Sequence, residues 1–243
     1  MSTSPLSFLS PLREARQFLL PERCVVCGSW LLHACEGSYP LCSGCEMLLR
    51  GELISGPRCR VCGRPLIGEI EVCTACRERG FAFTAVYPLG LYTGTLAAVL
   101  RAYKLEGCRT LAVLFADLLL PVLAARTGGE LLVRVPSSAA SVRRRGWDHT
   151  AEICRILGQR GRFRFLPLLR RRRSRAQKSL DFAARSSNLR GKIVAAGGQE
   201  LRGARVLCFD DVLTTGATLH ACAQALMDRG AGEVRAVVIA ADP

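Results

Sequence analysis

The chain lacks the long apolar runs that would place it in or across a membrane. No run reaches the ~18 apolar residues of a membrane-spanning helix, and the longest apolar stretch, at 111–125, is interrupted by Asp117 and Pro121. The N-terminus has no apolar signal-peptide core, because charged residues interrupt its apolar spacing. We therefore predict a cytoplasmic protein without a membrane span.

Aromatic residues are scarce, at 6% of the chain, and acidic residues are nearly missing from one region. Residues 134–192 hold 17 basic and three acidic side chains, so this segment alone has the net charge of +14 that the whole chain carries. The positive charge is therefore local. A focused basic segment favours an anionic partner. The alternative is a solvated charged surface.

Eight of the 13 cysteines stand in four Cys-x-x-Cys pairs. Two thiolates on one tight turn can reach the same ion, and two such pairs complete a closed tetrahedral site. In a cytoplasmic chain this pattern predicts two structural Zn²⁺ ions, with redox-active dithiols as the alternative. Sequential pairing is the simplest arrangement, and the spacing leaves interleaved pairing open. The expected ligands are Cys24, Cys27, Cys42, Cys45, Cys59, Cys62, Cys73 and Cys76.

The cysteine pairs divide the chain into two expected domains. Residues 1–80 would form an N-terminal helix and a cysteine-rich module too small for a large core, so that metal supplies much of its folding energy. In residues 81–243, strands alternate with helices, which predicts an α/β fold with a parallel sheet. We expect extended segments at 81–92 (with a turn near Pro88), 131–135, 164–168, 206–209 and 234–240, and helices at 94–106, 111–125, 151–157 and 219–227.

A buried strand, two acids and a hydroxyl-rich glycine loop follow one another at residues 206–218. N–H groups at the start of the following helix can bind a phosphate, and Gly216 allows close approach of the backbone. Asp210 and Asp211 are the candidate catalytic residues, because carboxylates there can hold ribose hydroxyls. Simple helix capping is the alternative. The expected phosphate-binding residues are Thr214, Thr215, Gly216, Ala217 and Thr218.

Two arginine-rich blocks precede this motif. The first, in an expected loop after Val135, suits a pyrophosphate, because Arg can bind phosphate oxygens with two N–H groups. The second, at 169–180, has no apolar periodicity and is expected to be a loop that contacts nucleic acid. A solvated surface is the alternative for both. The residues are Arg143, Arg144 and Arg145 for pyrophosphate, and Arg170, Arg171, Arg172, Arg173, Arg175 and Lys178 for nucleic acid.

Residues 206–218 resemble the phosphoribosyl-pyrophosphate (PRPP) signature of type I phosphoribosyltransferases, and nearly the whole chain resembles the ComF family. The likeness includes 102–107 around Lys104, Val135-Pro136, Arg145-Gly146 and Leu168-Leu169-Arg170, followed by Gln177, Leu180, Arg185 and Asn188. One departure is Trp147-Asp148-His149, where the family usually has Phe-Asn-Gln.

The resemblance implies a type I phosphoribosyltransferase-like parallel sheet behind a double zinc ribbon. It further implies binding of PRPP with Mg²⁺, and a link to uptake of single-stranded DNA in natural transformation, with peripheral association with the uptake machinery. It names no acceptor, so a phosphoribosyltransferase and a non-catalytic single-stranded DNA adaptor that retains the sugar-phosphate site are both open. A zinc-finger transcription factor is disfavoured, because residues 1–80 carry a net charge of only +1.

Overall fold

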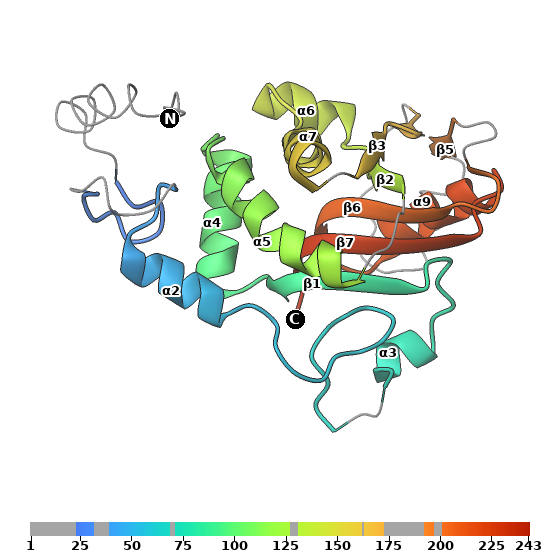
Figure 1. Ribbon diagram of the computed structural model, residues 1–243, viewed down its shortest axis with the longest axis horizontal. Helices are drawn as coiled ribbons and strands as arrows, with labels where there is room; N and C mark the ends of the chain where they lie inside the picture. The colour runs from blue at the N-terminus through green and yellow to red at the C-terminus, as the bar shows by residue number, and fades with distance from the viewer. Residues whose placement is uncertain are drawn as a thin grey trace, which may run out of the picture.

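The structure, a computed structural model, describes residues 23–31, 39–68, 71–126, 131–161, 163–172, 192–196 and 201–243. At its centre lies a five-stranded sheet with the strand order β1-β7-β6-β2-β3, in which every pair is parallel. Figure 1 shows the sheet with helices packed against it. Its strands are β1 (Ala85–Leu91), β2 (Leu131–Arg134), β3 (Arg164–Leu166), β6 (Arg205–Leu213) and β7 (Glu233–Ala241).

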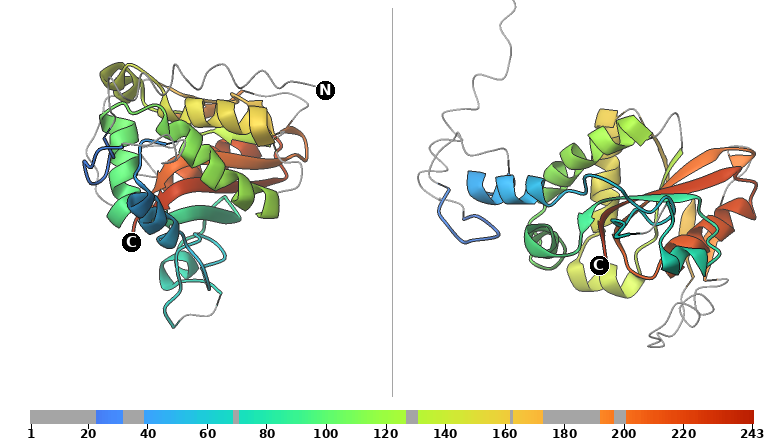
Figure 2. Two further views of the ribbon diagram at one scale, coloured as in Figure 1. Left: turned by 60° about the vertical axis from the view of Figure 1, so that its left-hand side comes forward. Right: turned by 90° about the horizontal axis from the view of Figure 1, so that it is seen from below.

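Helices cover both faces of the sheet, as expected for parallel strands that are joined by crossovers. Figure 2 shows this layering from two further directions. A small antiparallel hairpin stands apart from the sheet and is formed by β4 (Leu169–Arg171) and β5 (Ile193–Ala195). The helices are α2 (Ser43–Gly51), α3 (Thr74–Arg77), α4 (Gly94–Leu105), α5 (Leu111–Arg126), α6 (Ala139–Arg145), α7 (His149–Gly161) and α9 (Ala217–Met227).

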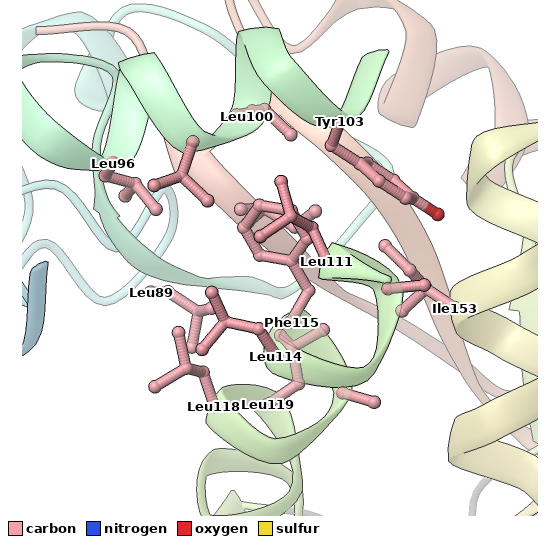
Figure 3. Close-up of a cluster of buried hydrophobic side chains, with 14 of the residues drawn as sticks. Leu89, Leu96, Leu100, Tyr103, Leu111, Leu114, Phe115, Leu118, Leu119 and Ile153 are labelled. Atoms are coloured by element: carbon pink, nitrogen blue, oxygen red, sulfur yellow. The ribbon is translucent and has the colours of Figure 1, made fainter. Parts of the chain in front are cut away.

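Two hydrophobic cores fill the space between the layers. The first joins α4, α5 and α7 to one face of the sheet. Figure 3 shows part of it, with Phe115 among leucines of α4 and α5 and with Ile153 of α7 beside them. The second core joins α9 and the β4–β5 hairpin to the opposite face. β6 lies between β7 and β2 in the sheet, with one core on each of its faces. Its residues from Val206 to Phe209 are therefore fully buried.

The cysteine-rich segment, which runs from Cys24 to Cys76, shares these cores with the sheet. Cys24 and Cys45 pack into the first core, whereas Cys59 and Cys62 pack into the second. The two halves of the segment therefore attach to opposite faces of the sheet. A division of the chain near residue 80 stays a prediction.

The outer edge of β1 is covered by main-chain groups of the cysteine-rich segment. Val86 N donates to Val61 O (2.8 Å), and Ile54 N donates to Leu89 O (2.7 Å). The turn expected near Pro88 is wrong, because β1 continues through this residue to Leu91. N–H directions alternate along a strand, so position 88 would point its N–H to the outer side, as Val86 does. Proline is tolerated there because an edge position needs no ladder donor.

Two loops expected from the sequence contain regular structure. Residues 139–145 form α6, which begins after Ser138, whose side chain accepts a hydrogen bond from Ser141 N, and ends at Gly146. Residues 169–171 form β4, because Leu169 is buried in the second core while its arginine neighbours are exposed. The expected N-terminal helix and the rest of the second arginine block lie outside the described residues. No described helix is long and apolar enough to cross a bilayer.

Candidate metal centres and anion site

The eight paired cysteines form two compact clusters. One contains Cys24, Cys27, Cys42 and Cys45 and the other Cys59, Cys62, Cys73 and Cys76, with all four Sγ atoms of each within 4.8 Å of one another. A tetrahedral ion with Zn–S bonds of ~2.3 Å needs sulfur atoms ~3.8 Å apart. The Cys27–Cys42 and Cys62–Cys73 sulfur distances are 3.7 Å and 3.8 Å. Both clusters therefore fit a structural zinc ion, and the pairing is sequential.

The second cluster (Cys59, Cys62, Cys73 and Cys76) lies directly against β1. Its first turn ends at Gly63, which has φ of +72°. A Cβ at this position would lie 2.3 Å from Val86 O and 2.2 Å from Pro88 Cδ. Only glycine fits this contact, so the turn that holds the metal ligands is packed against the edge of the sheet.

A carboxylate of the cysteine-rich segment caps a helix of the sheet domain. Glu52, which follows α2, accepts hydrogen bonds from the main-chain nitrogens of Thr95 and Leu96 (both 2.9 Å) in the first turn of α4. Burial alone would raise the pKa of Glu52, but these two N–H groups hold it below its usual value. Because α4 carries Lys104 near its other end, Glu52 helps to fix the helix that supplies this lysine.

The two adjacent acids of β6 lie on opposite faces of the sheet. Successive side chains of a strand alternate between faces, and Phe209 belongs to the first core while Cys208 belongs to the second. Asp210 therefore faces the α9 side. The pKa of Cys222 in α9 agrees with this placement. It is raised first by burial and then by the charges of Cys208 and Asp210, so Asp210 lies close to α9. Asp211 faces α4 and α7.

Asp211 is held by two basic side chains. Its Oδ2 atom forms an ion pair with Lys104 Nζ (2.7 Å) and a short hydrogen bond with His149 Nε2. Burial would raise the pKa of Asp211, but the His149 hydrogen bond and the Lys104 charge hold it well below its ordinary range. A carboxylate can only accept, so Nε2 of His149 carries the hydrogen. The sequence placed Lys104 on a helix and did not predict its contact with Asp211.

The residues that depart from the ComF pattern all face inward. Trp147 packs edge-to-face on Tyr103, with ring centroids 4.9 Å apart. Asp148 pairs with Arg134 and accepts a hydrogen bond from Ala151 N (3.2 Å) in the first turn of α7. His149 is 2% exposed, and its carbonyl accepts a hydrogen bond from Tyr103 Oη (2.6 Å). The three substitutions therefore fit this chain's own packing and charges.

Asp210 lacks a cationic partner of this kind among the described residues. Its carboxyl accepts a hydrogen bond from Asp211 N (2.9 Å). Burial and the neighbouring negative charge of Asp211 raise the pKa of Asp210 well above the ordinary carboxyl range. The charges of Lys104 and Arg171 act in the opposite direction. Arg171, in β4, is thus close enough to influence this carboxyl.

The expected phosphate-binding residues form the turn between β6 and α9 together with the first two residues of that helix, and this stretch is called the 214–218 turn below. Gly216 precedes the helix with φ of +81°, a conformation that favours glycine. The first turn of a helix leaves N–H groups without intrahelical partners, and those of α9 point toward this turn. Thr214 is exposed, Thr215 and Thr218 are half-buried, and Ala217 is buried. The turn and Asp210 therefore lie on the α9 side of the sheet.

The arginines of the two basic blocks have different settings. Arg143 and Arg144 are exposed on the last turn of α6. Arg145 is half-buried, and its Nε atom has no hydrogen-bond partner among the described residues. Arg170, Arg171 and Arg172 are exposed on the β4–β5 hairpin, which packs against α9. Arg173, Arg175 and Lys178 lie outside the described residues.

Comparison with known proteins matches both parts of the chain. Residues 15–77 match the double zinc ribbon domain, and residues 152–243 match the phosphoribosyl transferase domain. Competence protein F of Haemophilus influenzae is 28% identical over 228 residues, which cover 88% of this chain and 94% of that protein. DNA utilization protein YhgH of Escherichia coli O6:H1 is 27% identical over 207 residues, which cover 82% and 89%.

Solved structures align with about half of the chain. The allosteric regulatory enzyme of purine biosynthesis aligns with 54% of this chain and 26% of its own, at 19% identity and a TM-score of 0.36. Hypoxanthine phosphoribosyl transferase of Trypanosoma cruzi aligns with 55% of this chain and 64% of its own, at 15% identity and a TM-score of 0.35.

The chain therefore joins a double zinc ribbon domain to a phosphoribosyltransferase domain, and the expected fold class is confirmed. The resemblance to the ComF family is confirmed as well, since both curated relatives match along most of the chain.

Proposed function

We propose that this protein binds PRPP or a related sugar phosphate at the carboxyl end of β6. The observation that carries the proposal is the position of Asp210 and the 214–218 turn on the same side of the sheet, at the N-terminus of α9. The N–H groups of the helix start would bind the 5′-phosphate. Asp210 would hold the ribose hydroxyls, with Asp211 behind it as the anchor of Lys104 and His149.

The other end of PRPP carries a pyrophosphate, for which α6 supplies the arginines. Arg143 and Arg144 are exposed and so accessible to a ligand, and Arg145 has an unpartnered Nε atom among the described residues. Mg²⁺ would neutralise phosphate charge and bind carboxylate oxygen, as its preference for hard oxygen ligands requires. Exposed Arg171 lies near Asp210 and adds positive charge.

In the enzymatic form of the proposal, the chain transfers the phosphoribosyl group. A nucleophile on an acceptor would form a bond to C1 of the ribose while the bond from C1 to pyrophosphate breaks. The transition state would resemble an oxocarbenium ion, so positioning and charge stabilisation would account for most of the acceleration.

The test is calorimetric titration of the zinc-loaded chain with PRPP and Mg²⁺. Asp210→Asn should weaken binding by at least ~10-fold, the equivalent of one charge-assisted hydrogen bond. Arg155→Ala, on the exposed face of α7, is the matched surface control and should bind as the parent chain does. Absence of measurable binding to the parent chain would overturn the proposal. Turnover with a panel of bases then separates an enzyme from a binding protein.

A second proposed function is binding of single-stranded DNA. Arg170, Arg171 and Arg172 are exposed along the hairpin next to Asp210, and phosphate neutralisation by arginine drives nucleic-acid affinity. The relatives' names, Competence protein F and DNA utilization protein YhgH, agree with a role in DNA uptake. Peripheral association with the uptake machinery is part of the same proposal. Replacing Arg170 and Arg172 by Glu should weaken binding to a labelled oligonucleotide and reduce its salt dependence. An unchanged affinity would count against this function.

A further inference from the structure

The second cysteine cluster reaches the phosphate-binding turn through one side chain. Arg64 follows the Cys59–Gly63 turn, and its Nη2 atom donates a hydrogen bond to the carbonyl oxygen of Thr214 (2.7 Å). The main chain of Arg64 is itself fixed by the metal-binding turn, because Cys59 N donates to Arg64 O (2.8 Å). Arg64, a half-buried residue, therefore links a metal ligand to the first residue of the phosphate-binding turn.

Residues just after the cluster pack on the same turn. The rings of Phe81 and Phe83 are stacked, with centroids 4.5 Å apart. A Cβ at Gly216 would lie 2.9 Å from the Phe81 ring, so this ring covers the glycine. Ala82 N donates to His220 Nδ1 (3.0 Å) in the first turn of α9. These contacts attach the turn at Thr214, at Gly216 and at the start of the helix.

The Arg64 hydrogen bond also determines how the turn presents its donors. In a planar trans peptide, the carbonyl of one residue and the N–H of the next point in opposite directions. Because Arg64 draws the Thr214 carbonyl toward the zinc ribbon, the N–H of Thr215 points away from the ribbon. The same bond occupies a carbonyl oxygen that would otherwise repel an anion. One guanidinium therefore orients a donor and neutralises an acceptor.

We propose that Arg64 is a positioning residue for the 5′-phosphate, so that the second zinc ribbon is part of the sugar-phosphate site. This inference rests on the proposed function and adds to it a residue from outside the phosphoribosyltransferase domain. It assigns Arg64 to one end of the ligand only, because its contact is to the 214–218 turn and not to the arginines of α6.

The test compares three probes on zinc-loaded protein: PRPP, ribose 5-phosphate and pyrophosphate, each with Mg²⁺. Arg64→Ala should weaken binding of PRPP and ribose 5-phosphate by about 10-fold, because the turn loses the charged hydrogen bond that orients the Thr215 N–H. Pyrophosphate binding should stay within about twofold. Arg64→Lys, which keeps one donor, should recover part of the loss. Arg60→Ala, an exposed arginine on the same turn, is the matched control and should leave all three affinities unchanged.

Each outcome separates this inference from the proposed function. If the parent chain binds none of the probes, the proposed function fails and the inference with it. If the parent chain binds but Arg64→Ala, with two zinc ions retained, binds ribose 5-phosphate equally well, the inference alone is overturned. Equal weakening of pyrophosphate would show a general charge effect and would overturn it too. Should Arg64→Ala lose zinc, Arg64→Lys and Arg64→Gln are compared instead. Arg64→Lys should bind ribose 5-phosphate more tightly than Arg64→Gln, and equal binding by the two variants would overturn the inference.

Discussion

His149 and Asp211 are 62 positions apart in the chain and form a short hydrogen bond at the carboxyl end of β6. The contact joins the start of α7 to the central strand, and Lys104 adds α4 to the same carboxylate. One half-buried acid therefore connects three elements. Asp210, which precedes Asp211 in β6, faces the opposite side of the sheet, so its carboxyl group lies on the α9 side.

Removing His149 should destabilise the protein through Asp211. His149→Ala leaves the half-buried Asp211 carboxylate with one partner fewer, at a cost of about 1–3 kcal/mol in the free energy of unfolding. His149→Gln, which keeps an N–H donor, should lose less. Urea denaturation of His149→Ala, Asp211→Asn and the double variant should give a coupling energy of ~0.5–3 kcal/mol. Strictly additive losses would contradict a direct interaction.

Asp210→Asn should make the ligand-free protein more stable than the parent protein, by a margin that grows as the pH rises. The folded state raises the pKa of Asp210 from its ordinary ~3.9 to about 8. The contribution of Asp210 to the free energy of unfolding is therefore fully present below the ordinary carboxyl pKa, and it is lost as the pH rises through the folded-state pKa. The amide cannot ionise, so the difference in Tm should grow between ~pH 5 and ~pH 8 in buffer without divalent cations.

Asp211→Asn is the matched variant for that titration and should behave in the opposite way. The folded state lowers the pKa of Asp211, so its stabilisation is present above the ordinary carboxyl pKa and is lost as pH falls through the folded-state pKa. The variant should melt below the parent protein at neutral pH, and the difference should shrink in acid. Parallel pH profiles for the two variants would argue against opposite settings of the two acids.

Glu52→Gln should loosen α4 at its start. The amide accepts main-chain N–H bonds more weakly than the carboxylate, and loss of a helix cap costs about 0.5–2 kcal/mol. Glu46→Gln, in an ion pair with the exposed Arg50 of α2, is the control and should change stability by less than ~0.5 kcal/mol. Hydrogen exchange should report faster exchange at Thr95 and Leu96 in Glu52→Gln alone.

Loss of each zinc ion should affect a different side of the protein. Cys45→Ser should reduce the metal content from two ions to one and speed hydrogen exchange in α4 and α5, whose core contains Cys45. Cys76→Ser should do the same in α9 and the 214–218 turn. Cys108→Ser, outside both clusters, should retain two ions. Identical exchange patterns in the two cluster variants would contradict separate attachment.

The sequence predicted the features that repeat a strong local pattern. The four cysteine pairs predicted two clusters, and the alternation of apolar segments predicted the parallel sheet and the helices α4, α5 and α9. Sequential pairing of the cysteines needed the structure, because both arrangements place two short turns around one ion. α6 was missed, although Ser138 before it and Gly146 after it are ordinary signals for the ends of a helix.

The arrangement around the two acids depended on contacts between distant residues. The sequence treated Asp210 and Asp211 as one pair, but strand alternation separates them, and β6 extends to Leu213 instead of ending before the acids. The partners of Asp211 come from α4 and from the start of α7, which no spacing rule connects to β6. Arg64 had no signal in the sequence, since its bond to Thr214 spans 150 positions.

The cover over β1 has a consequence for the handling of the protein. An unpaired strand edge can pair with another chain and begin aggregation. Here Pro88 removes one donor from that edge, and the main chain around Ile54 and Val61 occupies neighbouring groups. Chelation of zinc would release this cover and expose the outer edge of β1 to other copies of the protein. The cysteine-rich segment is thus expected to keep the protein soluble, so that metal-depleted samples form oligomers before the sheet itself unfolds.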